Sequence, residues 1–393
     1  MRDRDDIVRG RPGRPGTASS TQMTVETQNR ESRSRNQVQE PAHFRPSSEL
    51  RFRFGISLLL VLLAFAIILA VGVGTVAVPA RVIISILLNH SGIVHLPRVW
   101  TVSDETIILQ IRLPRVLGAA LVGTALSVAG ALFQGLLRNP LADPYVIGVS
   151  GGAGLGATVG VLLSTHFSIL GFGAVPGLAF LGALGTVVLV YQLSRIGGRT
   201  PVVTLLLAGF AVSIMLGYAM SFLLIVNDRL QLNTPFIYAW LLGGISVVRW
   251  AQVGTIAFVA VIGSALAFVL ARSLNALSLG EEYAQHLGIP VEAHKAAIIA
   301  VGSLLTAAAV SGGGLIGFVG LIVPHFLRLV FGPNHSRLLP LVALGGATFL
   351  VVADLLARTV MPPTELPVGI LTAFVGGPAF LLLLRRSKRE YRF

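Results

Sequence analysis

The side chains that could perform or drive chemistry are few in this chain of 393 residues. It has no cysteine, which excludes disulfides, thiolate metal sites and iron–sulfur ligation. Its only lysines are Lys295, in AHKAA, and Lys388, in RSKRE, so it lacks the Gly-Lys-Ser/Thr loop that holds the phosphates of ATP. The eight histidines are scattered and lack ligand spacing. We therefore expect no catalytic residue, no cofactor and no metal site.

One carboxylate lies deep inside an apolar segment: Asp354, in FLVVADLLART. Ion-driven carriers rely on such carboxylates inside the membrane. Arg358 follows Asp354 at the i+4 spacing that pairs opposite charges on a helix. The spacing favours a structural ion pair, and a proton relay through Asp354 stays open as the alternative.

The segments that carry these residues are typical of a membrane protein. The chain is 54% hydrophobic and only 12% charged, whereas soluble domains carry about 25% charged residues. The net charge of +13 comes from arginines in a tail and at segment ends, where they set membrane orientation, so we expect no nucleic-acid partner. Nine apolar segments reach the roughly 20 residues that a helix needs to cross a bilayer: 54–78, 114–137, 146–165, 168–194, 202–226, 251–271, 296–314, 338–360 and 367–384.

The ends of the chain constrain the number of crossings. Arginines crowd both ends, and such basic ends prefer the cytoplasm, so we expect both termini inside and an even number of crossings. A shorter apolar run over 315–330, broken by glycines and a proline, makes the tenth. Residues 1–50 are polar and rich in Arg, Ser and Pro, which predicts a disordered basic cytoplasmic tail ahead of a transmembrane domain over 51–393.

The largest inner loop, 272–295, predicts a short helix. Ser278 followed by Glu281 is the pattern of a capping box, and Gly288 with Pro290 gives a stop. Such a helix suits insertion into a groove on a partner or a place on the membrane surface, and its acidic pair argues against anionic lipid. The helix and its flanks comprise Leu279, Gly280, Glu281, Glu282, Tyr283, Ala284, Gln285, His286, Leu287 and Gly288.

Two further features lie at the outer side and in the tenth crossing. Arg112 and Arg115, in QIRLPR, and Arg358 fall outside against the charge rule, either to dock an acidic external partner or as arginines that snorkel at helix ends. Irregular backbone at membrane depth is tolerated where it is buried in protein or lines a cavity. The glycine-rich break therefore marks either a pathway or tight helix packing, with Gly313, Gly314 and Gly317 as candidates.

Several phrases of this sequence, in the same order, are similar to those of the FecCD-type permeases of ATP-binding-cassette (ABC) importers, which carry ferric siderophores, haem or vitamin B12. The resemblance extends from about residue 54 to 385 and leaves out the N-terminal tail. The phrases are QIRLPR (110–115), GALFQGLLRNPLADPYVIGVSGGAGLGA (130–157), LGEEYAQHLGIP (279–290), GFVGLIVPHFLRL (317–329) and ELPVGILTAFVGGPAFLLLL (365–384).

The resemblance implies an all-α, type II ABC importer permease fold with about ten transmembrane helices per subunit. It implies a homodimer in the lipid bilayer of a bacterial cytoplasmic (inner) membrane, with a path at the dimer interface. Cytoplasmic ATPase subunits would receive the loop helix, and an extracytoplasmic solute-binding protein would dock on the three outer arginines. The fifth helix would line the path, with Ser213 and Ser221 as candidates. ATP binding would then drive alternating access.

The cargo is not fixed by any motif in the chain. Ferric siderophores lead because they are the commonest cargo of the family, and cobalamin and haem use the same architecture. The rival from another class is an ion-driven secondary transporter, which needs more membrane carboxylates than Asp354. A passive channel and a respiratory-complex subunit are the remaining alternatives.

Overall fold

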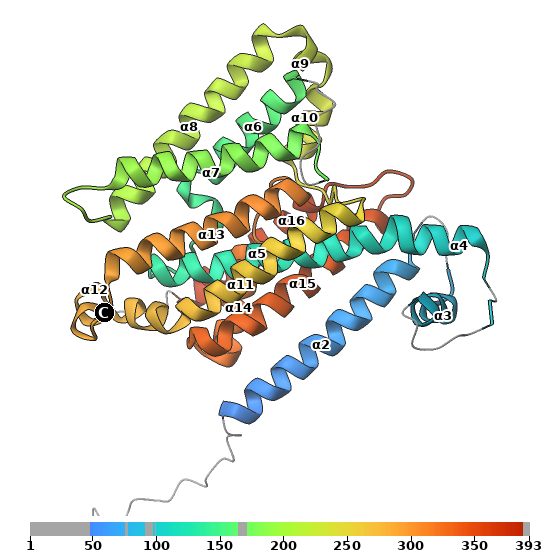
Figure 1. Cartoon of the computed structure of the whole chain (residues 1–393), viewed down its shortest axis with the longest axis horizontal. Helices are drawn as coiled ribbons and strands as arrows, with labels where there is room; N and C mark the ends of the chain where they lie inside the picture. Colours follow the sequence, from blue (N-terminus) through green and yellow to red (C-terminus); the bar gives the residue numbers. More distant parts are fainter. Residues whose placement is uncertain (1–47, 75–77, 91–96, 99, 164–170, 388–393) are drawn as a thin grey trace, which may run out of the picture. The chain divides into compact units, whose positions relative to one another are not determined.

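A computed structural model describes residues 48–387 of the chain except 75–77, 91–96, 99 and 164–170. The predicted tail lies outside the described residues up to residue 47, and 48–50 already belong to the first helix. The described residues from Leu50 onward belong to one compact unit. The described part is all-α (Figure 1), with helices α2 Ser48–Gly72, α3 Ala80–His90, α4 Val102–Thr106, α5 Leu113–Leu136, α6 Val149–Leu163, α7 Ala174–Ser194, α8 Val202–Val226, α9 Asp228–Leu232, α10 Thr234–Leu241, α11 Trp250–Leu279, α12 Glu281–His286, α13 Val291–Gly313, α14 Val319–Phe331, α15 His335–Thr359 and α16 Val368–Ser387.

The predicted crossings correspond to helices in the described part of the chain. Seven helices there are long and apolar enough to span a membrane, namely those that contain α2, α5, α7, α8, α11, α13 and α15. The other three predicted crossings appear as the shorter apolar helices α6, α14 and α16. The all-α, multi-pass architecture is therefore confirmed, with the broken segment over 315–330 reduced to the 13-residue α14.

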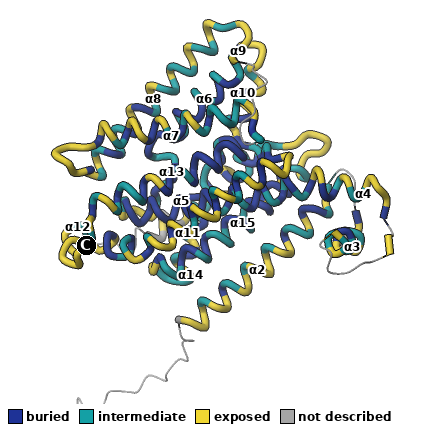
Figure 2. The backbone as a smooth tube through the Cα atoms, in the orientation of Figure 1, coloured by how far each residue is buried: buried dark blue, intermediate teal, exposed yellow. Residues whose placement is uncertain are grey.

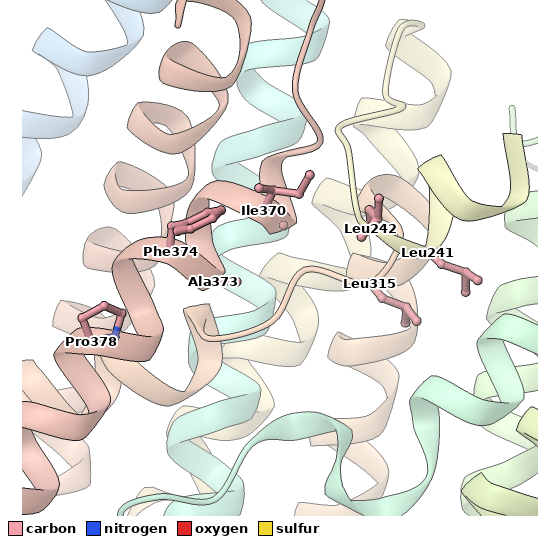
Figure 3. Close-up of a pocket in the computed structure, with 8 residues that line it drawn as sticks. Leu241, Leu242, Leu315, Ile370, Ala373, Phe374 and Pro378 are labelled. Atoms are coloured by element: carbon pink, nitrogen blue, oxygen red, sulfur yellow. The ribbon is translucent and has the colours of Figure 1, made fainter. Parts of the chain in front are cut away.

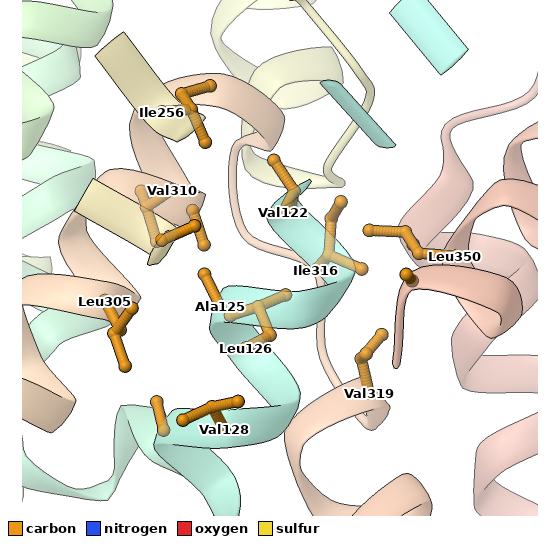
Figure 4. Packing of buried hydrophobic residues seen from close by; sticks show 14 of the residues in the cluster. Val122, Ala125, Leu126, Val128, Ile256, Leu305, Val310, Ile316, Val319 and Leu350 are labelled. Carbon is orange, nitrogen blue, oxygen red and sulfur yellow. The ribbon is translucent and has the colours of Figure 1, made fainter. Parts of the chain in front are cut away.

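Helix α5 forms the centre of the fold. Nearly all of its residues are buried, and α11, α13, α14 and α15 pack around it (Figure 2). Two glycines allow the closest approaches: a Cβ on Gly123 would overlap the carbonyl of Gly346, and one on Gly130 would overlap that of Gly320. Small residues at such crossings let membrane helices pack backbone to backbone. The apolar side chains between them form the cluster in Figure 4, which includes Val122, Leu126, Ile256, Val310 and Leu350.

The predicted start of the loop helix is wrong. Helix α11 continues to Leu279, and the hydroxyl of Ser278 donates to the carbonyl of Asn275 at 2.7 Å instead of capping a new helix. Gly280, at φ +134°, ends α11, and α12 covers only Glu281–His286, without a side-chain cap. Continuation of the long apolar helix outcompetes the local capping pattern, so Leu279 and Gly280 do not belong to α12.

Candidate functional site

The loop between α11 and α13 presents an apolar surface around α12. Leu279, Tyr283 and Leu287 follow one another at four-residue intervals and are 69%, 51% and 58% exposed. Ala284 is fully buried and anchors the short helix. We call these three exposed side chains the α12 patch. Leu279 is the last residue of α11, and Tyr283 and Leu287 lie in the loop that follows it. A clustered apolar surface of this kind marks an interaction site.

A buried lysine lies behind the α12 patch. The ammonium of Lys295, whose side chain is only 4% exposed, contacts Glu281 of α12 at 3.0 Å and Glu292 of α13 at 3.0 Å. Glu292 also accepts a hydrogen bond from the backbone N–H of Thr200 at 2.9 Å. This cluster joins the consecutive helices α12 and α13 to Thr200, which lies 92 residues before Glu292 in the chain.

The three arginines of the predicted docking site come together at the other end of α11, where the Trp250 indole donates to the carbonyl of Leu109. Arg115 pairs with Asp354 at 3.1 Å and with Glu365 at 2.9 Å. Arg358 pairs with the second oxygen of Asp354 at 3.0 Å, which confirms the ion pair expected from their i+4 spacing.

Two of these arginines also complete the end of α2. Arg112 donates to the carbonyls of Val71 and Gly72 at 2.8 and 3.1 Å, and Arg358 donates to that of Ala70 at 3.1 Å. The last carbonyls of a helix lack partners inside the helix and favour positive charge.

Because the three arginines bind groups within the chain, little of their side chains is exposed to a partner. Arg112 is 6% exposed, and the side chain of Arg358 is 7% exposed. The side chain of Arg115 is 22% exposed beside Glu365, which is 54% exposed. In this structure the arginines chiefly hold α2, α5, α15 and the segment before α16 together. Of the charged side chains in this cluster, those of Arg115 and Glu365 are the ones exposed enough to contact a partner.

The candidate pathway residues fall into two groups. Gly313 and Gly314 are buried, and Gly314 has the carbonyl of Trp240 directly against it, so both serve close packing here. Gly317 is half-buried with no atom within 4 Å of where a Cβ would stand. On α8, Ser213 packs against Gly151 of α6, whereas Ser221 is exposed and donates to its own helix at 3.0 Å.

Helix α8 presents one long uncovered face. The exposed residues recur every three or four positions, the period of one helix face. They are Val203, Leu207, Phe210, Ile214, Tyr218, Phe222 and Ile225. Only 17% of the apolar window of α8 is buried, against 78% for the helix that contains α5. This face contacts lipid or another protein chain.

An apolar cavity of about 450 Å³ lies beside the broken crossing, between α10, the segment before α14, and α16. Figure 3 shows Leu241, Leu242 and Leu315 on one side and Ile370, Phe374 and Pro378 on the other. The sequence indicated the glycine-rich break but not this cavity, because α10 was not predicted and its residues are far from α16 along the chain.

The described part of the chain is a multi-pass helical fold with an exposed apolar surface at one end of α11 and a charged cluster at the other. The model of the FecCD transport family matches residues 62–386, and the chain belongs to that family.

Similar proteins agree with this class. The cobalamin import system permease protein BtuC of Halobacterium salinarum is 48% identical, with 73% of this chain and 75% of that protein covered. The Fe(3+)-citrate import system permease protein YfmD of Bacillus subtilis is 41% identical, with 74% and 85% covered. The solved structure of a metal-chelate type ABC transporter in an inward-facing conformation gives a TM-score of 0.71 at 30% identity, with 84% and 98% covered.

Proposed function

We propose that this permease imports a ferric siderophore across a bacterial cytoplasmic membrane by alternating access, driven by a partner ATPase. The α12 patch carries the proposal, because an apolar surface outside the membrane needs a partner. Both termini lie in the cytoplasm in this arrangement, on the side of the ATPase.

The ATPase binds at the α12 patch. Tyr283→Ala with Leu287→Ala should reduce copurification of the ATPase at least tenfold, because aromatic and aliphatic anchors dominate such interfaces. Leu232→Ala is the matched control: it truncates an 84% exposed leucine on α9, away from this loop. Equal ATPase recovery with the double variant and the control would rule out the patch.

A second copy of the chain covers the exposed face of α8, and the path runs between the two copies. The chain has no cysteine, so single cysteines report contacts cleanly. In membranes, Tyr218→Cys should form a disulfide-linked dimer on mild oxidation. Val269→Cys, 74% exposed on α11, should stay monomeric. The opposite pattern would place the dimer interface elsewhere.

An extracytoplasmic binding protein docks at Arg115, the most accessible of Arg112, Arg115 and Arg358. Arg115→Gln should weaken its binding, and the effect should shrink at high salt because exposed charges are screened. Binding that does not change with this substitution or with salt would remove the docking site.

The cargo is a metal chelate. The iron-citrate relative supports a ferric chelate, and the cobalamin relative, at the higher identity of 48%, makes cobalamin the second candidate. Cells that express the permease with its ATPase and binding protein should be offered labelled ferric siderophore and labelled cobalamin side by side. Uptake of cobalamin alone would replace the cargo and keep the rest.

A further inference from the structure

Helix α12 is connected to its neighbours by glycines on both sides. Gly280 separates it from α11 at φ +134°, and Gly288 separates it from α13 at φ +76°. Both conformations favour glycine, and neither glycine has another atom within 4 Å of a Cβ position. Helix α12 is therefore joined to α11 and α13 through turns and not through continuous helix.

A side-chain contact bridges the second of these breaks. Lys295 of α13 reaches both carboxylate oxygens of Glu281 in α12, at 3.0 and 3.1 Å. Its ammonium is buried while the carboxylates of Glu281 and Glu292 are 38% and 34% exposed. A buried charge held by two partners in fixed geometry is costly to separate from them. The pair therefore adds a side-chain link between α12 and α13 across this turn.

The same cluster extends to α8. The second oxygen of Glu292 accepts the backbone N–H of Thr200, a residue that is 1% exposed. Thr200 precedes Pro201, the N-cap of α8. A continuous chain of contacts thus leads from α12 through Lys295 and Glu292 to the first residues of α8.

We propose that Lys295 and Glu292 are positioning residues that transmit displacement of α12 to α13 and to the start of α8. The inference rests on the proposed docking of an ATPase at the α12 patch. Lys295 does not touch the cargo or ATP; it makes α12, α13 and α8 move as one body when the ATPase closes.

The test measures coupling in the complete transporter, as cargo imported per ATP hydrolysed. Lys295→Met keeps the length of the side chain and removes its charge, and import per ATP should fall at least tenfold while the ATPase still copurifies. Lys295→Arg should restore most of the coupling, because a guanidinium bridges two carboxylates. Arg272→Met is the matched control, because it removes a positive charge from an exposed position of α11. Its import per ATP should equal that of the wild type. Wild-type coupling in Lys295→Met would overturn the proposal, as would failure of Lys295→Arg to restore it.

A second variant decides the matter if Lys295→Met does not fold. Glu281→Gln changes a partly exposed residue, and it should lower import per ATP severalfold without loss of the ATPase. Unchanged coupling in that variant would overturn the proposal. Failure of the proposed function gives a different result: wild-type permease would not bind the ATPase at all, or its import would not need ATP.

Discussion

Asp354 shows how a carboxylate in a membrane helix is put to structural use. It is 1% exposed, and its two oxygens are taken by Arg115 and Arg358. A proton relay needs a carboxylate that faces a cavity and exchanges its proton. Here both oxygens of Asp354 are instead paired with arginines and the side chain is buried, which argues against the ion-driven carrier.

Removal of the Asp354 charge should destabilise the protein strongly. Asp354→Asn leaves two neighbouring arginines short of a counterion, and breaking a buried ion pair costs about 3–5 kcal/mol. We expect a large fall in the thermal midpoint of the detergent-solubilised protein. Glu365→Gln removes the exposed partner and should cost at most about 1 kcal/mol. Equal effects of the two variants would contradict this account of the cluster.

Asp143, between α5 and α6, should make stability depend on pH. Burial raises the pKa of Asp143 from its ordinary 3.8 to about 6, although a hydrogen bond from the backbone N–H of Tyr145 opposes the shift. The folded state therefore holds this proton at pH values where the unfolded chain has lost it. Stability from this group is greatest below pH 3.8, falls as the pH rises to about 6, and is constant above that.

The matched variant is Asp143→Asn, because its amide oxygen still accepts from Tyr145. We expect the variant to be more stable than wild type at pH 7 and closer to it at pH 4.5, by thermal unfolding in detergent. A difference between the two proteins that does not change with pH would refute the shifted pKa.

At the scale of elements, α5 holds the fold together through contacts that only glycine permits. Gly130 and Gly123 bring its backbone against α14 and α15, and no side chain fits between them. Because the non-helical break at 314–318 directly precedes α14, the position of that break depends on how closely α14 approaches α5. Loosening this approach should affect transport as well as stability.

One methyl group tests this dependence. Gly130→Ala should destabilise the protein by about 1–3 kcal/mol or more, because overpacking forces the two backbones apart. Gly185→Ala is the control within α7, where no atom lies within 4 Å of the new methyl group. It should be neutral or stabilise by up to about 1 kcal/mol. The measurement is the thermal midpoint of each variant. Equal midpoints for Gly130→Ala and Gly185→Ala would mean that α5 and α14 can move apart without loss of stability.

The elements differ in how well the sequence predicted them. A membrane crossing can be predicted from the length and hydrophobicity of one continuous segment, without knowledge of distant contacts. All ten predicted segments therefore correspond to helices in the described part of the chain. The start of α12 was missed because α11 continues through Ser278. The inward use of Arg112 could not be predicted, because its partners lie about 40 residues away at the end of α2. The role of Lys295 was not predicted, because its contact with Glu281 depends on how α12 folds against α13.

For the whole molecule, the two candidate docking regions lie at opposite ends of one helix. Helix α11 begins at Trp250 beside the arginine cluster and ends at Leu279 beside α12. Its 30 residues span about 45 Å at 1.5 Å per residue. A partner at either end is therefore too far away to act on the other directly, and the helices between must carry the signal. Alternating access requires that ATP favours one arrangement of these helices over the other.

The most direct test is uptake by proteoliposomes that contain this permease, its ATPase and its binding protein. Labelled ferric siderophore and labelled cobalamin are supplied outside, and the ATPase is either active or catalytically dead. We predict that ferric siderophore accumulates only with ATP and the active ATPase, and that collapse of the proton gradient changes nothing. Accumulation that persists with the dead ATPase, or that stops when the gradient collapses, would contradict the importer.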